Sequence, residues 1–232
     1  MQTRISEISA ISEKSASDIK EWRELKFQLA MAEDTIEQLK SNAEYLRKQS
    51  NLGKRFSTRT FDSFDPNGNR TAYEVCRRYV DTKAYDSEKN GLIICGAYGT
   101  GKTHLAASIA NYAVDNGIPT LFDTYGGHLE KLKAEFATDR EPRYLNLMRN
   151  VDILILDDVG KEKQTEWSES IMFDVINHRY ENMKPVIITS NFSSRELESY
   201  FGEACYSRLV ETCNAIVTSG KDKRRGADQI LI

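Results

Sequence analysis

The sequence predicts an α/β fold, a parallel five-stranded sheet with helices on both faces, preceded by a helical N-terminal region. Three observations support this prediction. Short apolar runs alternate with helical patterns from residue 91 onward. The first run breaks into a glycine-rich loop, which opens an alanine-rich helix. Within residues 1–50, the stretch from Trp22 to Leu46 instead repeats apolar side chains at a seven-residue spacing, which is typical of a helix with a narrow apolar seam.

Composition limits the class of protein. Of 232 residues, 40% are hydrophobic and 29% are charged, which suffices for a core and a polar surface. The net charge of −3 gives no overall basic field, so a nucleic-acid site would have to be a local patch. No apolar run approaches a membrane span, and the N-terminus lacks a signal-peptide core. The cysteines form no C-x-x-C pair, which favours a reducing, cytoplasmic location without disulfides or a zinc site. They are Cys76, Cys95, Cys205 and Cys213.

The N-terminal region, residues 1–50, is expected to be helical. The repeat predicts a helix of roughly 25 residues with a narrow seam. Its two core positions are taken by Trp22, Leu29, Ile36 and Ala43, and by Leu25, Ala32, Leu39 and Leu46. A shorter helix is expected around Ile5, Ile8 and Ile11. The seam could close on itself as a helical hairpin or could dock a partner, and the pattern does not separate these alternatives. Residues 51–55 break the helix, so we expect a second domain over 51–232.

Aromatic residues and turn formers lead into the second domain. Phe56, Phe61 and Phe64 are expected to pack against the core rather than near a nucleotide base. The strands are expected at 92–95, 119–122, 153–156, 186–189 and 215–217. Helices are expected near 71–83, 102–116, 127–137, 141–150, 167–183 and 194–201. In an open parallel sheet, ligands bind beyond the carboxyl ends of the strands, so further functional residues are expected there.

The loop after the first strand fits the pattern G-x-x-x-x-G-K-[ST] of a phosphate-binding loop, or P-loop. Its glycines let the backbone wrap around a phosphate, with N–H groups and the helix N-terminus facing the anion. Lys102 would reach the β- and γ-phosphates, and the Thr103 hydroxyl would bind Mg²⁺. A nucleoside triphosphate site is therefore predicted. Its candidate residues are Gly96, Ala97, Tyr98, Gly99, Thr100, Gly101, Lys102, Thr103 and His104.

Polar side chains also follow two later strands. The run 153–156 leads into Asp157, which we assign to the metal, and Asp158, which would polarise the attacking water. The run 186–189 leads to Asn191, which could hold the γ-phosphate or the water, or could simply start a helix. Farther on, Arg208 could pair with an acid of its own fold or act in a neighbour's site as an arginine finger. The basic cluster at 219–226 is typical of a solvated end.

These motifs, in this order and spacing, resemble the bacterial helicase loaders of the DnaC/DnaI type, which are AAA+ ATPases related to the initiator DnaA and the transposition helper IstB. The motifs are Phe61-Asp-Ser-Phe64, Gly96–Thr103, Ile155–Gly160, Thr189-Ser-Asn191, Ser207-Arg-Leu209 and Gly220–Arg224. The resemblance covers roughly residues 52 to 226. It implies a slow ATPase with ATP and Mg²⁺ as cofactors, in which Asn191 is a sensor-1 residue, Arg208 is the trans-acting finger and Arg224 is a sensor-like residue.

The resemblance also implies partners. Residues 1–50 would grip the ring-shaped replicative DNA helicase, and the AAA+ domain would form a homo-oligomer on ATP and touch single-stranded DNA. The segment 124–150 occupies the place of the DNA-contacting elements in such proteins. Its basic residues are Lys131, Lys133, Arg140, Arg143 and Arg149, and Tyr125 and Tyr144 could stack on bases.

Three departures from the family pattern stand out. The second acid is Asp158 where most AAA+ enzymes have Glu, so hydrolysis is expected to be slow. The sequence ends soon after Arg225, so no full lid domain is expected. The N-terminal region lacks the cysteines of a zinc module. Two rival readings remain: an IstB-like ATPase that regulates a transposase on duplex DNA, and an adaptor that uses nucleotide as a switch with negligible hydrolysis.

Overall fold

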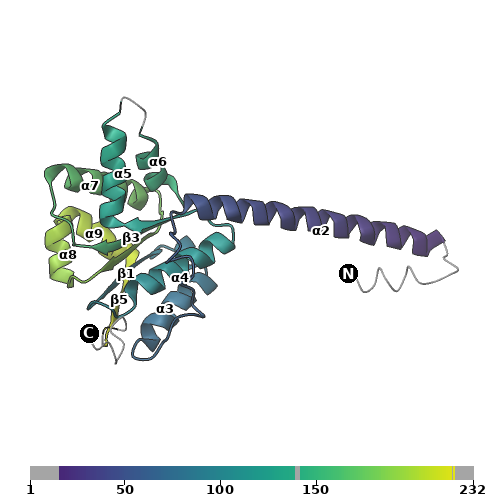
Figure 1. Ribbon diagram of the computed structural model, residues 1–232, viewed down its shortest axis with the longest axis horizontal. Coiled ribbons are helices and arrows are strands. Elements are labelled where there is room, and N and C mark those ends of the chain that lie inside the picture. Colours follow the sequence, from purple (N-terminus) through teal and green to yellow (C-terminus); the bar gives the residue numbers. More distant parts are fainter. Residues whose placement is uncertain (1–15, 139–141, 221, 223–232) are drawn as a thin grey trace, which may run out of the picture. The chain divides into compact units, whose positions relative to one another are not determined.

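The computed structural model describes residues 16–138, 142–220 and 222 (Figure 1). The chain divides into two compact units, Met1–Tyr45 and Leu46–Ile232, and this boundary falls inside the first described helix. No helix within the described ranges is long and apolar enough to cross a membrane.

The predicted N-terminal helix is present and is longer than expected. Helix α2 spans Ala16–Gln49, which is 34 residues. Of the seam side chains that the structure describes, Trp22, Leu25 and Leu29 are half-buried and Ala32 is exposed. The remaining seam side chains and the short helix expected near Ile5–Ile11 lie outside what is described. The occupant of the seam therefore stays a prediction.

The second unit is built on the expected five-stranded parallel sheet. Its strand order is β2-β3-β4-β1-β5. The strands are β1 (Gly91–Gly96), β2 (Thr120–Thr124), β3 (Ile153–Val159), β4 (Val186–Ser190) and β5 (Cys213–Thr218). Strand β4 thus lies between β1, which leads into the P-loop, and β3, which carries the two acids. This placement decides which side chains can meet at the carboxyl edge.

The helices lie on both faces of the sheet (Figure 1). They are α3 (Arg70–Asp81), the 3₁₀ turn η1 (Ala84–Asp86), α4 (Lys102–Asp115), α5 (Tyr125–Phe136), α6 (Arg143–Asn150), α7 (Glu166–Glu181), α8 (Ser194–Phe201) and α9 (Glu203–Thr212). Helix α9 was not predicted. It starts directly after Gly202, which ends α8 and adopts a φ of 77°, so no loop separates the two helices in the sequence.

Alternate residues of each strand feed two separate cores, because successive side chains of a strand point to opposite faces. Ile93 and Ile188 pack with α5, α6, α7, α8 and α9 on one face. Leu92 and Ile187 pack with α3 and α4 on the other. The second core also buries Phe61 and Phe64, which confirms that these rings pack rather than line a base site.

One buried cation holds the amino edge of the sheet together. Arg179, on α7, is fully buried and donates hydrogen bonds to five backbone carbonyls. These carbonyls belong to Met148, Arg149, Val151, Asp152 and Pro185. Two of them belong to the last turn of α6, and the other three lie just before β3 and β4. Burial lowers the pKa of Arg179 to about 9, which leaves it charged at neutral pH.

Candidate functional site

The predicted P-loop joins β1 to α4, so the expected order of strand, loop and helix is confirmed. Gly99 and Gly101 adopt φ values of 73° and 100°, a region that favours glycine. A Cβ atom on Gly101 would also lie 2.7 Å from the ring of Phe64. The loop ends at the N-terminus of α4, where the first main-chain N–H groups of a helix have no acceptor within the helix and can face an anion. The backbone therefore fits a phosphate group.

Lys102 begins α4 and is only 6% exposed. Its Nζ donates to the carbonyls of Gly96 and Ala97, each at 2.8 Å, and to Oδ1 of Asn191 at 2.6 Å. Asn191 reaches Lys102 because β4 is the direct neighbour of β1. The structure therefore brings together two of the predicted site residues that lie 89 positions apart.

Asp157 lies near the carboxyl end of β3 and is 2% exposed. Burial raises the pKa of its carboxyl from 3.8 to about 6, although hydrogen bonds from Thr189 and Thr103 act to lower it. A hydroxyl and a carboxylate oxygen are the hard ligands that Mg²⁺ takes, and a bound cation favours the ionised carboxylate. Thr103 and Asp157 are therefore adjacent and fit the predicted ion.

Asp158 adopts an unusual backbone conformation. Its φ is 61°, in the left-handed region that few residues other than glycine, asparagine and aspartate occupy. The ladder between β3 and β4 pairs Leu156 with Ile188 and then Val159 with Ser190, so a bulge falls at the two acids. The Asp158 carboxylate forms an ion pair with Lys161. The strand was expected to end before these acids, but it continues through them to Val159.

Two residues that support the P-loop were not recognised in the sequence. Asn69 is buried and donates from Nδ2 to the carbonyls of Thr100 (3.0 Å) and Ser219 (2.8 Å). The hydroxyl of Thr100 meets that of Thr218 at 2.7 Å. Asn69 resembled an ordinary turn residue before a helix, and Thr218 an ordinary end of a strand. Only their contacts across 31 and 118 positions reveal the support.

The side chain of His104, another predicted site residue, contacts the segment that precedes α3. The Nε2 atom of His104 lies 3.0 Å from the carbonyl oxygen of Thr60 and 3.1 Å from the hydroxyl of Ser63. Its ring also meets the ring of Phe64 edge-on. Any contribution of His104 to nucleotide binding would therefore come from its main chain. Tyr98 is 60% exposed.

The two predicted arginines lie in different settings. Arg208, on α9, donates to the Ala204 carbonyl and lies over the rings of Phe173 and Tyr180. It lines a cavity with residues that precede β1, β4 and β5, so it lies at the amino edge of the sheet and not at its own P-loop. Arg224 falls outside the described residues. Asp222, two positions earlier, packs against Gly99.

The basic segment 124–150 is more involved in internal contacts than expected. Tyr125 is fully buried between α5 and α8, so the expectation that it could stack on a base is wrong. The Tyr144 hydroxyl contacts Nδ1 of His128 at 2.9 Å. Lys131 pairs with Asp123, and Arg149 pairs with Asp174. Lys133 lies over the ring of Trp167, Arg143 is exposed, and Arg140 lies outside the described residues.

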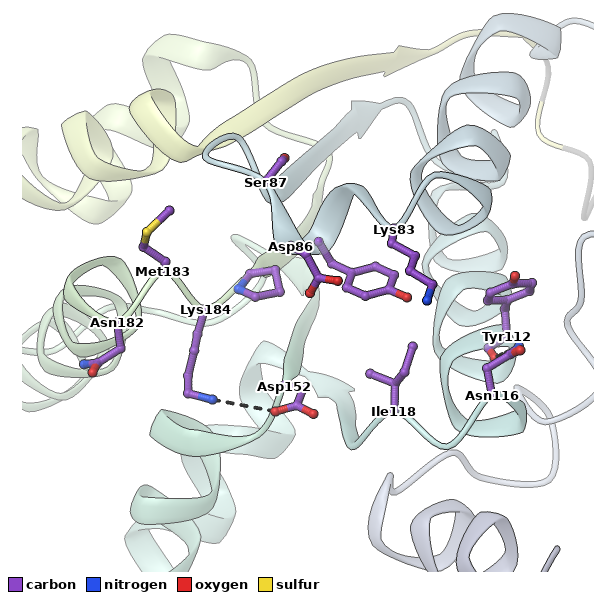
Figure 2. Close-up of a pocket in the computed structure, with 12 residues that line it drawn as sticks. Lys83, Asp86, Ser87, Tyr112, Asn116, Ile118, Asp152, Asn182, Met183 and Lys184 are labelled. Atoms are coloured by element: carbon purple, nitrogen blue, oxygen red, sulfur yellow. Dashed lines mark hydrogen bonds and ion pairs between the residues drawn. The ribbon is translucent and has the colours of Figure 1, made fainter. Parts of the chain in front are cut away.

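A cavity of about 660 Å³ opens at the amino edge of the sheet, away from the P-loop. Figure 2 shows Lys83, Asp86 and Ile118 directed into the same space. On one side, Lys184 forms an ion pair with Asp152 at 3.7 Å. The residues of the nucleotide site are not among those that line this cavity. Volume alone therefore does not mark the site.

Comparisons with known proteins agree with this geometry. The phage-like element PBSX protein XkdC of Bacillus subtilis (strain 168) is 30% identical over 193 residues, which are 79% of this chain and 70% of XkdC. The replicative helicase loader DnaC of Escherichia coli (strain K12) is 28% identical over 144 residues. That match spans 61% of this chain and 58% of DnaC.

A solved structure and a family model extend these similarities. The crystal structure of the DnaC helicase loader has a TM-score of 0.66 and 29% identity, and the match covers 72% of this chain and all of that one. The second unit therefore has the predicted AAA+ fold, built on the strand order β2-β3-β4-β1-β5. The family model described as IstB-like ATP binding protein matches residues 5–229. The chain belongs to the family of IstB-like ATP-binding proteins.

Proposed function

We propose that this protein is an ATP-dependent helicase loader that binds the replicative DNA helicase and delivers it onto single-stranded DNA when replication starts. The observation that carries the proposal is the match between this chain and the complete solved chain of the DnaC helicase loader. The two share a fold at 29% identity, and the residues described above would supply an ATP site within that fold. The match to the curated DnaC sequence spans 58% of that protein, so the loader role itself is proposed.

The arrangement supports ATP hydrolysis as the reaction. Lys102 would donate to the β- and γ-phosphates in place of the loop carbonyls that it now contacts. Thr103 and Asp157 would hold Mg²⁺, which supplies charge stabilisation to the transferred phosphoryl group. Asp158 would polarise the attacking water, and Asn191 would orient the phosphate beside Lys102. Asp158 forms an ion pair with Lys161, and its side chain is shorter than that of the usual glutamate. We therefore expect slow ATP hydrolysis in the isolated protein.

Assembly of several copies would complete the site. Arg208 lies at the amino edge of its own sheet, so the P-loop that it would serve is that of a neighbouring copy. A finger supplied by a second copy raises phosphoryl-transfer rates by roughly 10³ to 10⁵. We therefore propose an ATP-bridged homo-oligomer in which each copy donates Arg208 to the next.

Helix α2 is the proposed contact with the helicase. It presents exposed Phe27 and Met31 one turn apart, with exposed fractions of 62% and 52%. These two residues lie on the side of the helix away from Trp22, Leu25 and Leu29, since 3.6 residues make one turn. Helices bind grooves on partner proteins through exposed apolar anchors at such spacings.

A second candidate function follows from the family model, which matches from residue 5 onward and so includes the N-terminal helix. An IstB-like protein would regulate a transposase on duplex DNA. Such a protein would use the same ATP site and the same N-terminal region with a different partner. The two candidates differ in partner protein and in the form of DNA that promotes assembly.

Native mass spectrometry of the full chain, mixed with the replicative helicase of its host, tests the proposal. We expect a complex that depends on ATP and is lost in the double variant Phe27→Ser, Met31→Ser. The matched control is Glu33→Ser, an exposed position on the same helix, which should keep the complex. If instead no helicase complex forms and ATP drives assembly on duplex DNA, the transposition reading replaces the loader.

A further inference from the structure

The two acids at the end of β3 depend on one side chain of the neighbouring strand. Thr189 lies on β4, opposite the bulge that contains Asp157 and Asp158. Its Oγ1 donates to Oδ1 of Asp157 at 2.5 Å and accepts the backbone N–H of Asp158 at 2.8 Å. Thr189 is fully buried, so water does not take over either bond. One hydroxyl thus contacts both residues.

We propose that Thr189 is a positioning residue that fixes the geometry of both acids and thereby tunes the magnesium site. This inference rests on the proposed ATPase function and goes beyond it. The hydroxyl holds the Asp157 carboxylate, which also takes part in a hydrogen bond with Thr103. The same hydroxyl binds the main chain of Asp158, whose side chain is turned toward Lys161.

The backbone geometry explains why a side chain is needed. In regular pairing of β3 with β4, the Asp158 N–H would donate to a main-chain carbonyl of β4. The bulge instead places two residues of β3 opposite one residue of β4. The buried N–H therefore needs another acceptor. The φ of 61° at Asp158 persists only when the surroundings hold it, and the Thr189 hydroxyl is such a restraint.

The Thr189 hydroxyl would also affect magnesium affinity, because it orients the Asp157 carboxylate that would bind the ion. Groups that hydrogen-bond to a metal-binding carboxylate orient it, and their loss typically weakens metal affinity or activity about 10- to 100-fold. The alternative is that Thr189 only satisfies the bulge and contributes to stability. The two readings differ in what a variant does to magnesium dependence.

The test compares three variants of the full chain. Thr189→Val removes the hydroxyl and keeps the branched shape, while Thr189→Ser keeps the hydroxyl. The matched control is Thr120→Val, another buried threonine, at the start of β2, whose hydroxyl donates to the Ile118 carbonyl. A fluorescent ATP analogue titrated with and without MgCl₂ reports nucleotide binding, and hydrogen exchange of the Asp158 amide reports the geometry without any ligand.

For Thr189→Val we expect metal-free nucleotide affinity to stay close to wild type. The MgCl₂ concentration for half-maximal binding should rise about 10-fold, and the Asp158 amide should exchange faster. Thr189→Ser and Thr120→Val should both stay near wild type. If Thr189→Val does not fold, Thr189→Ala takes its place.

The inference is overturned if a folded Thr189→Val keeps wild-type magnesium dependence, or if Thr189→Ser loses it. It is also overturned if Thr120→Val has the same effect, or if nucleotide binding by the wild-type protein does not depend on magnesium. The loader proposal can fail separately from this inference. If it is wrong, no helicase complex forms, but these variants still show the expected dependence on magnesium.

Discussion

Two buried cations, Lys102 and Arg179, lie at opposite edges of the same sheet. Arg179 donates all five of its hydrogen bonds described above to main-chain carbonyls that the fold fixes in place. Lys102 donates to two carbonyls of its own glycine loop and to the side chain of Asn191. A phosphate could replace the acceptors of Lys102, but no ligand could replace those of Arg179 without opening the sheet.

The comparison shows that burial alone does not identify a functional charge. Both cations are almost inaccessible to solvent. The difference lies in the flexibility of their acceptors and in the edge at which they lie. The amino edge also holds the cavity of about 660 Å³, yet its charged residues are partly paired with one another. We therefore assign the amino edge mainly to structural support and the carboxyl edge to the chemistry, and three of the four experiments below test that division.

The largest effect is expected at Arg208. This residue is the exception to the assignment of the two edges, because it lies at the amino edge and is proposed to act in catalysis. Arg208→Ala should lower turnover of the assembled protein by roughly 10³ and leave nucleotide affinity unchanged. Steady-state ATPase assays across protein concentrations measure this. Mixing Arg208→Ala with Lys102→Met should restore part of the activity, because each variant supplies what the other lacks.

The matched control for Arg208 is Arg195→Ala, which removes an exposed arginine of α8. It should retain wild-type turnover. Wild-type activity in Arg208→Ala, or no recovery in the mixture, would rule out an Arg208 finger acting between copies.

The next effect concerns stability. Arg179→Met should lower the free energy of unfolding by about 4 kcal/mol, because several buried carbonyls lose their donor at once. Urea denaturation measures this change. Arg179→Lys should be intermediate, since a lysine keeps the charge but lacks the planar fork that reaches carbonyls on two sides. Loss of nucleotide affinity in the folded Arg179→Met protein would contradict an architectural role.

A pH-dependent effect is expected at His128, which joins α5 to β3 through the Ile155 carbonyl at 3.0 Å. Burial lowers its pKa from 6.5 to about 4. Between these values the unfolded chain binds a proton that the folded chain does not, so stability falls as the pH drops from 6.5 to 4. The loss should reach about 3 kcal/mol at pH 4.

Chemical denaturation at a series of pH values measures the contribution of His128. His128→Gln keeps polar atoms in the ring's place but does not titrate in this range, so its stability should lack this component. An equal fall in stability for both proteins would assign the acid sensitivity to other groups.

The smallest effect in free energy is expected at Lys102. Lys102→Met should weaken ATP binding about 100-fold, which is about 2.7 kcal/mol, because charge-assisted bonds to phosphate are lost. The free energy of unfolding should change by less than about 1 kcal/mol, because removal of a buried charge offsets its lost hydrogen bonds. Isothermal titration and urea denaturation report the two quantities. A loss of stability as large as that of Arg179→Met would contradict the distinction between a structural cation at one edge and a ligand-binding cation at the other.

The sequence by itself determined the parts of this protein that depend on local pattern. The alternation of apolar runs with helices predicted all five parallel strands, and the spacing from Gly96 to Thr103 located the loop at the end of β1. The seven-residue repeat predicted α2, although not its full length. Such features depend on residues within a few turns of each other, so short windows of sequence contain them.

Only the tertiary structure decided the rest, because those features depend on strand order. The placement of β4 between β1 and β3 brings Asn191 to Lys102, and Thr189 to both acids. The supports at Asn69 and Thr218, the burial of Tyr125 and the position of Arg208 also come from contacts between distant segments. Local sequence does not encode which strands become neighbours, since that choice is made by the packing of all the helices against both faces at once.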